Sequence, residues 1–373
     1  MEWKEVTISD IANLKNGKKR PSESGVIPVF GGNGIMDYVN SFNGEDTIVI
    51  GRVGAYCGCV YLSKGKCWVS DNAIAVKAKE DNDNEYLYYL LSSLNLNYHH
   101  IGGAQPLMTQ DIIGRIEVIV PQTKDDQHRI ASILSPLDRK IELNNKINAD
   151  LEEMAQAIFK NWFVDFEPFK DGKFVDSELG KIPEGWKVGT LGDITKNKSA
   201  KVKERNDVKV LSPVTTGELV LSEEYFTKQV FSSSIAKYKI VNKGDFAYNP
   251  ARVNIGSLGR NEFDFDGCVS PVYVVFSVLD GYENYFDLFR KTDFFKDSVA
   301  SLAIGGVRQS LSYDDLSSIE VIIPSENAVE EFNNLYNQMK KTIKANKLES
   351  SRLSSLRDTL LPRLMSGEIE VPE

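Results

Sequence analysis

Cysteine and long apolar stretches are scarce in this sequence. Only four cysteines occur among its 373 residues, which does not suggest a disulfide framework and fits a reducing compartment. No apolar run approaches the roughly 20 residues that a membrane-spanning helix needs. The N-terminus also lacks the basic and apolar segments of a secretory signal. We therefore expect a cytoplasmic protein.

Basic residues are outnumbered by acidic ones. Lys and Arg number 44 against 53 Asp and Glu, so the net charge is −9. A protein that binds nucleic acid by itself usually has a basic surplus. The charge therefore argues against that class, unless basic groups cluster locally or a partner supplies positive charge. With 42% hydrophobic residues, the chain is long enough for two or three domains with their own cores.

Catalytic motifs are missing as well. The sequence has neither a phosphate-binding G-x-x-x-x-G-K-[ST] loop nor a strand-linked G-x-G-x-x-G. The glycine-rich residues 31–34 fit a tight turn better. Residues 248–251 share Asn-Pro with the Asn-Pro-Pro-aromatic motif of amino-methyltransferases, but they lack the second proline and the aromatic residue. We interpret them as a loop.

Three clustered cysteines raise the alternative of a metal site. Cys57, Cys59 and Cys67 could bind zinc, with His99 or His100 as the fourth ligand. Their spacing departs from the two- to four-residue gaps of common zinc sites, and the second half of the chain has a single cysteine in the matching region. Buried thiols are the favoured interpretation, so we expect no metal.

What the sequence does contain is an internal repeat. The opening eleven residues return at 184–194, and residues 101–121 (IGGAQPLMTQDIIGRIEVIVP) return at 304–324 (IGGVRQSLSYDDLSSIEVIIP). The loops between the repeated segments match poorly, which suits two related but different recognition surfaces on one scaffold. The matched residues of the opening and of one central loop are Trp3/Trp186, Lys4/Lys187, Thr7/Thr190, Asp10/Asp193, Ile11/Ile194 and Arg52/Arg252.

Each copy leads into a long helical stretch. Residues 122–165 and 325–366 carry apolar side chains at alternating steps of four and three, interrupted by asparagines. This pattern is typical of a coiled coil whose register is fixed by buried polar residues. Pro136 predicts a kink or a short lead-in segment in the first helix. The expected helix-pairing residues are Leu137, Ile141, Asn144, Leu151, Ile158, Trp162, Met339, Ile343, Asn346, Leu353, Leu360 and Leu364.

Short strands, with one helix at 84–94 or 282–295 before the last strand, predict mixed α/β (α+β) globular units. The predicted fold is two such domains in a pseudo-twofold tandem repeat, joined by two long antiparallel coiled-coil helices. The predicted segments are a globular domain (1–121), a helix (122–165), a connector (166–185), a second globular domain (186–324), and a helix with a tail (325–373).

Several loops suit contact with DNA. A basic loop follows the repeated opening in both copies, and lysines among small residues suit phosphate contact; a solvated basic loop is the alternative. Arg52 and Arg252 could each bind guanine O6 and N7, or they could bond a neighbouring carbonyl. The Gly-Gly turns present glutamine in one copy and arginine with glutamine in the other. This difference suits the reading of different bases, but sequence drift on a surface loop would also produce it. The remaining candidate contacts are Lys18, Lys19, Arg20, Tyr56, Gln105, Lys198, Lys201, Lys203, Asn254, Arg308 and Gln309.

About 40 helical residues at 1.5 Å each give an arm of roughly 60 Å. If the two helices pair antiparallel, the two globular domains contact two short DNA segments on either side of an unread spacer. Two unlike domains in one chain then predict an asymmetric bipartite site.

On these residues the sequence resembles the specificity subunits of type I restriction–modification systems. SELGKIPEGW (177–186), LRDTLLPRLMSGEIEV (356–371) and the paired IGG…IEVI[VI]P segments carry the resemblance over essentially the full length. It implies that the domains are target-recognition domains for double-stranded DNA, and that the helices dock two methyltransferase subunits. It also implies a chain that is non-catalytic and binds no cofactor itself.

The resemblance further implies S-adenosylmethionine on the methyltransferase subunits, and ATP with Mg on restriction subunits. Since the partners would supply basic surface, the isolated chain is predicted to bind DNA weakly. The alternatives are the specificity chain of a related type IIG- or IIB-like restriction system, a catalytic DNA methyltransferase or nuclease, and a repeat scaffold without a DNA role.

Overall fold

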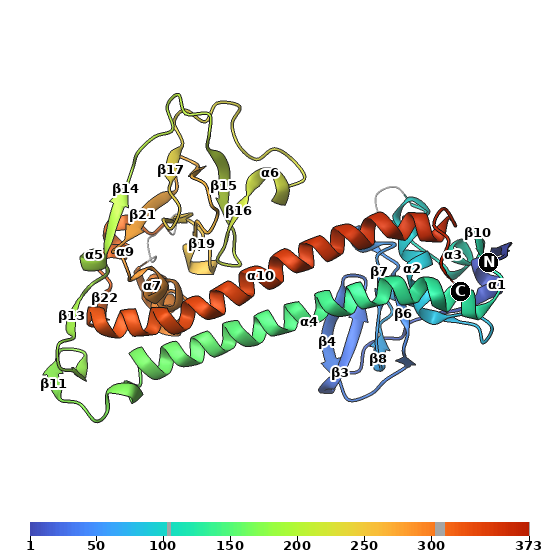
Figure 1. The fold of residues 1–373 in the computed structure, drawn as a ribbon, viewed down its shortest axis with the longest axis horizontal. Helices are drawn as coiled ribbons and strands as arrows, with labels where there is room; N and C mark the ends of the chain where they lie inside the picture. Colours follow the sequence, from blue (N-terminus) through green and yellow to red (C-terminus); the bar gives the residue numbers. More distant parts are fainter. Residues whose placement is uncertain (103–105, 303–309, 373) are drawn as a thin grey trace. The chain divides into compact units, whose positions relative to one another are not determined.

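A computed structural model describes residues 1–102, 106–302 and 310–372. The chain divides into two compact units, which we call unit 1 (residues 1–146 and 345–373) and unit 2 (residues 147–344). Two helices of 40 residues each, α4 (Lys124–Phe163) and α10 (Glu326–Met365), contribute one segment to each unit (Figure 1). Each unit is therefore a globular domain together with part of both long helices.

The other elements of unit 1 precede α4. Its strands are β1 (Trp3–Thr7), β2 (Ala12–Asn16), β3 (Ser24–Gly31), β4 (Gly34–Val39), β5 (Gly44–Glu45), β6 (Ile48–Gly51), β7 (Val60–Leu62), β8 (Lys66–Val69), β9 (Ala73–Ala78) and β10 (Glu117–Pro121). Its short helices are α1 (Ile8–Ile11), η1 (Gly54–Tyr56), α2 (Asn84–Ser93), η2 (Leu96–Tyr98) and α3 (Gln110–Gly114).

The elements of unit 2 lie between the two long helices in sequence. Its strands are β11 (Phe174–Ser177), β12 (Gly180–Pro183), β13 (Lys187–Thr190), β14 (Thr195–Lys198), β15 (Lys209–Pro213), β16 (Leu219–Leu221), β17 (Lys239–Val241), β18 (Phe246–Tyr248), β19 (Leu258–Arg260), β20 (Gly267–Val269), β21 (Val274–Val278) and β22 (Glu320–Ile323). Its short helices are η3 (Glu167–Phe169), α5 (Leu191–Ile194), α6 (Ser222–Tyr225), η4 (Val253–Ile255), α7 (Glu283–Phe289), α8 (Asp293–Leu302) and α9 (Tyr313–Ser317).

The repeat predicted from sequence is present in the sheet topology. Unit 1 has sheets with strand orders β1-β10, β2-β9-β6-β7 and β4-β3-β8-β5, and unit 2 has β13-β22, β14-β21-β18-β19 and β16-β15-β20-β17. The orders correspond strand for strand, and in each unit the same central pair, β3 with β8 or β15 with β20, is parallel. The predicted mixed α/β fold with two repeated domains joined by long helices is confirmed.

The repeated opening folds alike in both units. Its strand pairs antiparallel with the last strand of its own domain, β1 with β10 and β13 with β22. Thr7 and Thr190 then cap α1 and α5. The backbone N–H of each threonine donates to the aspartate three residues on, at 2.8 Å for Asp10 and 2.7 Å for Asp193. This capping box explains why threonine and aspartate recur at that spacing.

The repeated tryptophans pack at the ends of the long helices. In unit 2, Trp186 lies against Phe163 in the last turn of α4, with ring centroids 5.9 Å apart. In unit 1, Trp3 lies beside Gly367, which follows α10 in the left-handed conformation (φ +74°). A Cβ at Gly367 would come within 2.8 Å of Trp3 Cζ2, so glycine is needed both for the turn and for the close approach.

The two long helices pack on each other within each unit. In unit 1, Arg357 donates to Asp138 at 2.7 Å, and Asn144 Nδ2 donates to Glu349 at 2.8 Å. The residue numbers rise on α4 as they fall on α10, so these segments are antiparallel. In unit 2, Phe332 of α10 packs against Phe163 with centroids 5.0 Å apart. All twelve predicted helix-pairing residues are buried or half-buried.

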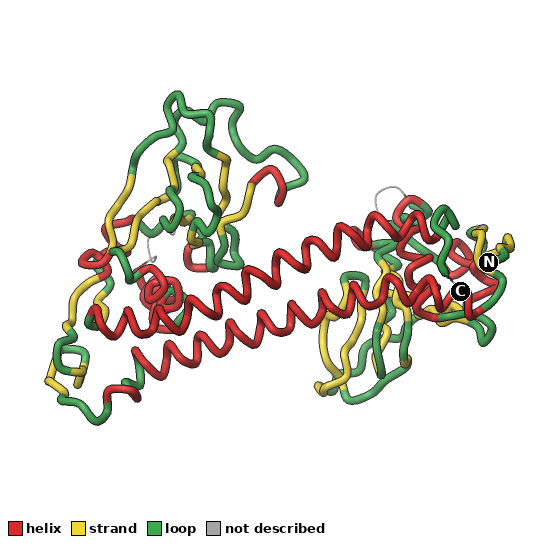
Figure 2. The backbone as a smooth tube through the Cα atoms, in the orientation of Figure 1, coloured by secondary structure: helices red, strands yellow, loops and turns green. Residues whose placement is uncertain are grey.

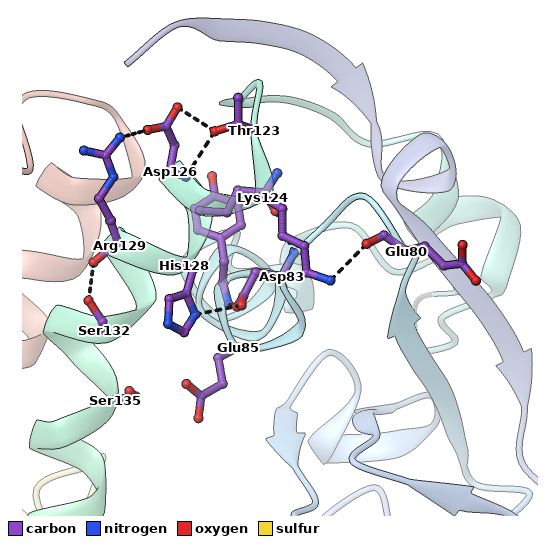
Figure 3. Close-up of polar contacts among 12 residues, drawn as sticks. Glu80, Asp83, Glu85, Thr123, Lys124, Asp126, His128, Arg129, Ser132 and Ser135 are labelled. Atoms are coloured by element: carbon purple, nitrogen blue, oxygen red, sulfur yellow. Dashed lines mark hydrogen bonds and ion pairs between the residues drawn. The ribbon is translucent and has the colours of Figure 1, made fainter. Parts of the chain in front are cut away.

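Polar contacts tie the start of α4 to the segment that precedes α2 (Figure 3). His128 Nδ1 lies 3.1 Å from Asp83 Oδ2, and Lys124 Nζ donates to the Glu80 carbonyl at 3.0 Å. Beneath them, fully buried Gln127 accepts from the Asp83 backbone N–H at 2.8 Å. Because Gln127 is buried and hydrogen-bonded, it fixes the angle at which the long helix leaves this domain.

In unit 2 the corresponding attachment is between α7 and α10. Asn284 Nδ2 donates to Asn333 Oδ1 and Asn337 Oδ1, each at 3.0 Å. In both units, therefore, α2 or α7, or the residues that lead into it, is hydrogen-bonded to the long helix that follows its own domain.

Three details differ from the sequence-based expectations. The helix expected at 282–295 is two helices, α7 and α8, because the Thr292 side chain accepts from the Phe295 N–H at 3.3 Å and starts a new helix. Pro136 lies inside α4, which begins at Lys124 without a separate lead-in segment. The connector contains the hairpin β11–β12 (Figure 2). The residue boundaries of the five predicted segments remain a prediction.

Phe163→Ala should destabilise unit 2. Phe163 is 5% exposed and contacts Trp186, Phe332 and Tyr285, so its truncation leaves a cavity that costs about 3–5 kcal/mol. The measurement is hydrogen exchange of unit 2 amides along a urea series. The matched control is Phe294→Ala, since Phe294 is 52% exposed. Equal losses for the two variants would contradict the central role of this cluster.

Candidate nucleic-acid interface

Arg52 stands at the end of β6, where two loops meet. Its backbone carbonyl accepts from the Met108 N–H at 2.8 Å, and its N–H donates to the Asn72 carbonyl at 3.1 Å. The Nε atom of its guanidinium is buried, and it has no hydrogen-bond partner among the described residues. The alternative of a guanidinium bonded to a neighbouring carbonyl therefore finds no support in the described part of unit 1.

The described residues on either side of the first Gly-Gly segment lie beside Arg52. Leu107 bridges to both Val53 and Ile101, and the Gly54 N–H donates to the Pro106 carbonyl at 3.2 Å. Gln105 itself lies outside the described residues. The structure nevertheless brings together two features that are some 50 positions apart in sequence, the arginine loop and the base of the turn. Tyr56, in η1 of the same loop, is 48% exposed.

Arg252 has an equivalent setting in unit 2. Leu311, which follows the second Gly-Gly segment in the sequence, donates its N–H to the Pro250 carbonyl at 3.1 Å. The Arg252 carbonyl accepts from the Ser257 N–H at 3.1 Å, while its side chain is exposed and bonds no described residue. Asn254, in η4, is also exposed. Arg308 and Gln309 lie outside the described residues.

The two basic loops differ from each other in their ion pairs. Arg20 is ion-paired with Asp37 in unit 1. Lys198 in unit 2 bonds Asp245 at 2.7 Å. Asp245 is 3% exposed, and this burial raises its pKa despite the lysine. Lys198 therefore has a structural partner. The other four lysines predicted to contact DNA have exposed side chains without an ion pair to any described residue. They are Lys18, Lys19, Lys201 and Lys203.

Two cavities flank residues 249–257 of unit 2, and neither was predicted from the sequence. One, of about 410 Å³, is lined by residues that include Thr216, Asn254 and Lys291. The other, of about 390 Å³, has Arg252 among its lining residues. Their walls come from segments that are far apart in sequence, so no local motif could reveal them.

A buried ion pair supports the wall of the first cavity. Arg290 bonds Asp287 at 2.6 Å and the Leu258 carbonyl at 2.8 Å. Burial alone would raise the pKa of Asp287, but the charge of Arg290, followed by those of Lys291 and Lys340, lowers it to about 2. Through these two bonds, Arg290 holds α7 against β19.

The cysteines are free thiols. Cys57 and Cys67 are buried, and burial raises the pKa of both. Within the described ranges, no three His, Cys, Asp or Glu side chains are grouped as a metal site would require. Over the same residues, no helix is both long and apolar enough to cross a bilayer.

Known proteins share this organisation. Residues 1–153 match the family described as type I restriction modification DNA specificity domain. The MjaIX type I restriction enzyme specificity subunit of Methanocaldococcus jannaschii is 28% identical over 332 residues, which cover 85% of this chain and 76% of the relative. The HindI specificity subunit of Haemophilus influenzae is 27% identical, and the alignment covers 76% of this chain and 77% of that one.

A solved structure shares the fold. The crystal structure of a type I restriction–modification S subunit from M. genitalium superposes with a TM-score of 0.64 at 18% identity, and the match covers 100% of this chain and 96% of that one. The chain therefore resembles the type I restriction–modification specificity subunits. The two relatives support that interpretation, and not the related restriction systems that we considered as an alternative.

Lys198→Ala should lower the stability of unit 2. It leaves buried Asp245 without its cation, which in a site of this partial exposure costs about 1–3 kcal/mol. Lys201→Ala, three positions on and exposed, should leave the unfolding midpoint unchanged. Chemical denaturation followed by circular dichroism measures both. If the Lys198 variant unfolds at the same denaturant concentration as the Lys201 variant, Lys198 has no structural role and becomes available for phosphate contact.

Proposed function

We propose that this chain is the non-catalytic DNA-specificity subunit of a type I restriction–modification complex, and that each globular domain reads one half of an asymmetric bipartite site. The two long helices join the domains and dock two methyltransferase subunits. S-adenosylmethionine binds to those subunits, whereas ATP and Mg bind to the restriction subunits when these are present. The chain itself binds no cofactor.

One observation carries the proposal. Two domains of the same fold place an arginine, matched in the sequence repeat, close to the residues that follow a Gly-Gly segment. Neither side chain bonds another described residue: the Nε of Arg52 is buried without a partner, and Arg252 is exposed. Arginine is the common reader of guanine in the major groove, where it bonds O6 and N7 together. Because the turns carry different residues in the two copies, the two domains favour different half-sites.

The net charge of −9 is compatible with this role if the methyltransferase subunits supply much of the basic surface. Sequence-independent affinity for DNA comes mainly from contacts with phosphates. In this chain, part of the basic side chains of the two loops is already paired with Asp37 and Asp245. The proposal therefore implies weak DNA binding by the isolated chain and specific binding by the complex.

Exchange of residues 186–324 for the same domain of a relative with a different target tests the proposal. The hybrid, assembled with its methyltransferase subunits, should methylate a site in which one half is new and the other half is unchanged. Sequencing that detects methylated adenines reads both halves in one experiment. The reciprocal exchange of residues 1–121 is the matched control and should change the opposite half. Hybrids that change both halves, or neither, contradict independent reading by two domains.

A further inference from the structure

The cavity beside Arg252 has a wall that is about equally apolar and polar. It measures about 390 Å³ and lies between β15, the segment that follows α6, and residues 249–257 of unit 2. Pro213, Val214, Phe226, Phe231 and Tyr273 are among its lining residues. The Pro213 and Val214 side chains are buried, and those of Phe226, Phe231 and Tyr273 are half-buried. A ligand would therefore meet an apolar patch on one part of this cavity wall.

Several polar groups of the same wall are already bound within the protein. The bonds are Ser212 Oγ with Ser222 Oγ at 2.7 Å, Ser257 Oγ to the Pro213 carbonyl at 2.9 Å, the Ser232 N–H to Tyr238 Oη at 3.1 Å, and the Ala251 N–H to Asn249 Oδ1 at 3.0 Å. Arg252 differs, because its guanidinium has no bond to a described residue. Among the described residues that line this cavity, Arg252 is also the only one with a cationic side chain.

The chemistry of the cavity selects a ligand with acceptors beside an apolar group. In the major groove of DNA, the paired acceptors that suit arginine are O6 and N7 of guanine, and the apolar group is the C5 methyl of thymine. Reading cytosine would favour a carboxylate acceptor, and none of the residues lining the described cavity is acidic. Reading adenine would favour a free amide, whereas Asn249 Oδ1 already accepts the Ala251 N–H.

We propose that the half-site read by unit 2 contains a guanine bound by Arg252 and a neighbouring thymine whose methyl group packs on the apolar side chains of this cavity. This inference rests on the proposed function, since it requires unit 2 to read DNA. It adds the base step that this domain selects, and it assigns the second base to the cavity wall rather than to a hydrogen-bonding side chain.

The experiment uses the complete methyltransferase complex and duplexes that carry its mapped site. In one duplex the guanine is replaced by 7-deazaguanine, and in another the thymine is replaced by uracil, which lacks the methyl. We expect kcat/KM for methylation to fall about 5- to 100-fold for the first and about fourfold for the second, the effect of one buried methyl group. Uracil in the unread spacer, or in the half-site of unit 1, is the control and should change little.

Two variants separate the contacts. With Arg252→Ala, 7-deazaguanine should cause no further loss, because the two changes remove the same bond. With Phe231→Ala, thymine and uracil duplexes should be methylated at equal rates. Thermal unfolding of both variants checks the fold, and the duplex substitutions test the wild-type complex even if a variant fails to fold.

A unit 2 half-site without adjacent guanine and thymine overturns the inference. A uracil duplex methylated as fast as the thymine duplex does so too, as does an additive loss in the Arg252 variant. Because the domain exchange tests separately whether unit 2 reads DNA, a normal exchange with any of these results defeats the inference and leaves the proposed function standing.

Discussion

Burial of a long helix in the core of a globular domain is the constraint on which each unit depends. In unit 1, Ile130, Ala131 and Leu134 of α4 are at most 1% exposed and belong to the same core as Tyr86 and Leu87 of α2. In unit 2, the other end of α4 enters the core through its aromatic side chains, together with the start of α10. A surface loop can change without disturbing these contacts, but a helix face cannot. This asymmetry allows the surface loops to diverge while the framework stays the same.

The hydrogen bonds between the long helices and their domains fix the orientation in which these elements pack. Apolar contacts tolerate small rotations, whereas a buried amide such as Gln127 or Asn284 must meet specific partners. The same reasoning applies to Asn144, which is fully buried at the helix pair and bonded to Glu349. That bond, and next the one from Lys140, keeps the pKa of Glu349 below its usual value. Buried polar residues at such positions favour one register of a helix pair over its neighbours.

The sequence was sufficient for the framework because the framework is where the repeat preserves its residues. Thr7 and Asp10 recur as a capping box, the tryptophans recur at helix ends, and the seam asparagine is buried as its spacing predicted. The contacts of the candidate site could be predicted from the sequence less well. The ion pairs of Lys198 and Arg20 involve carboxylates 47 and 17 positions away, and the cavity wall is assembled from several separate segments. Local spacing contains no information on such partners, which only the tertiary fold supplies.

If one chain carries two independent readers of DNA, genome-wide mapping of methylated adenines in the host, with and without this gene, should reveal both. One methylated motif should disappear on deletion, and this motif should consist of two unlike short halves separated by a gap of unspecified bases. An unchanged methylation map, or the loss of a single continuous motif, would contradict this prediction.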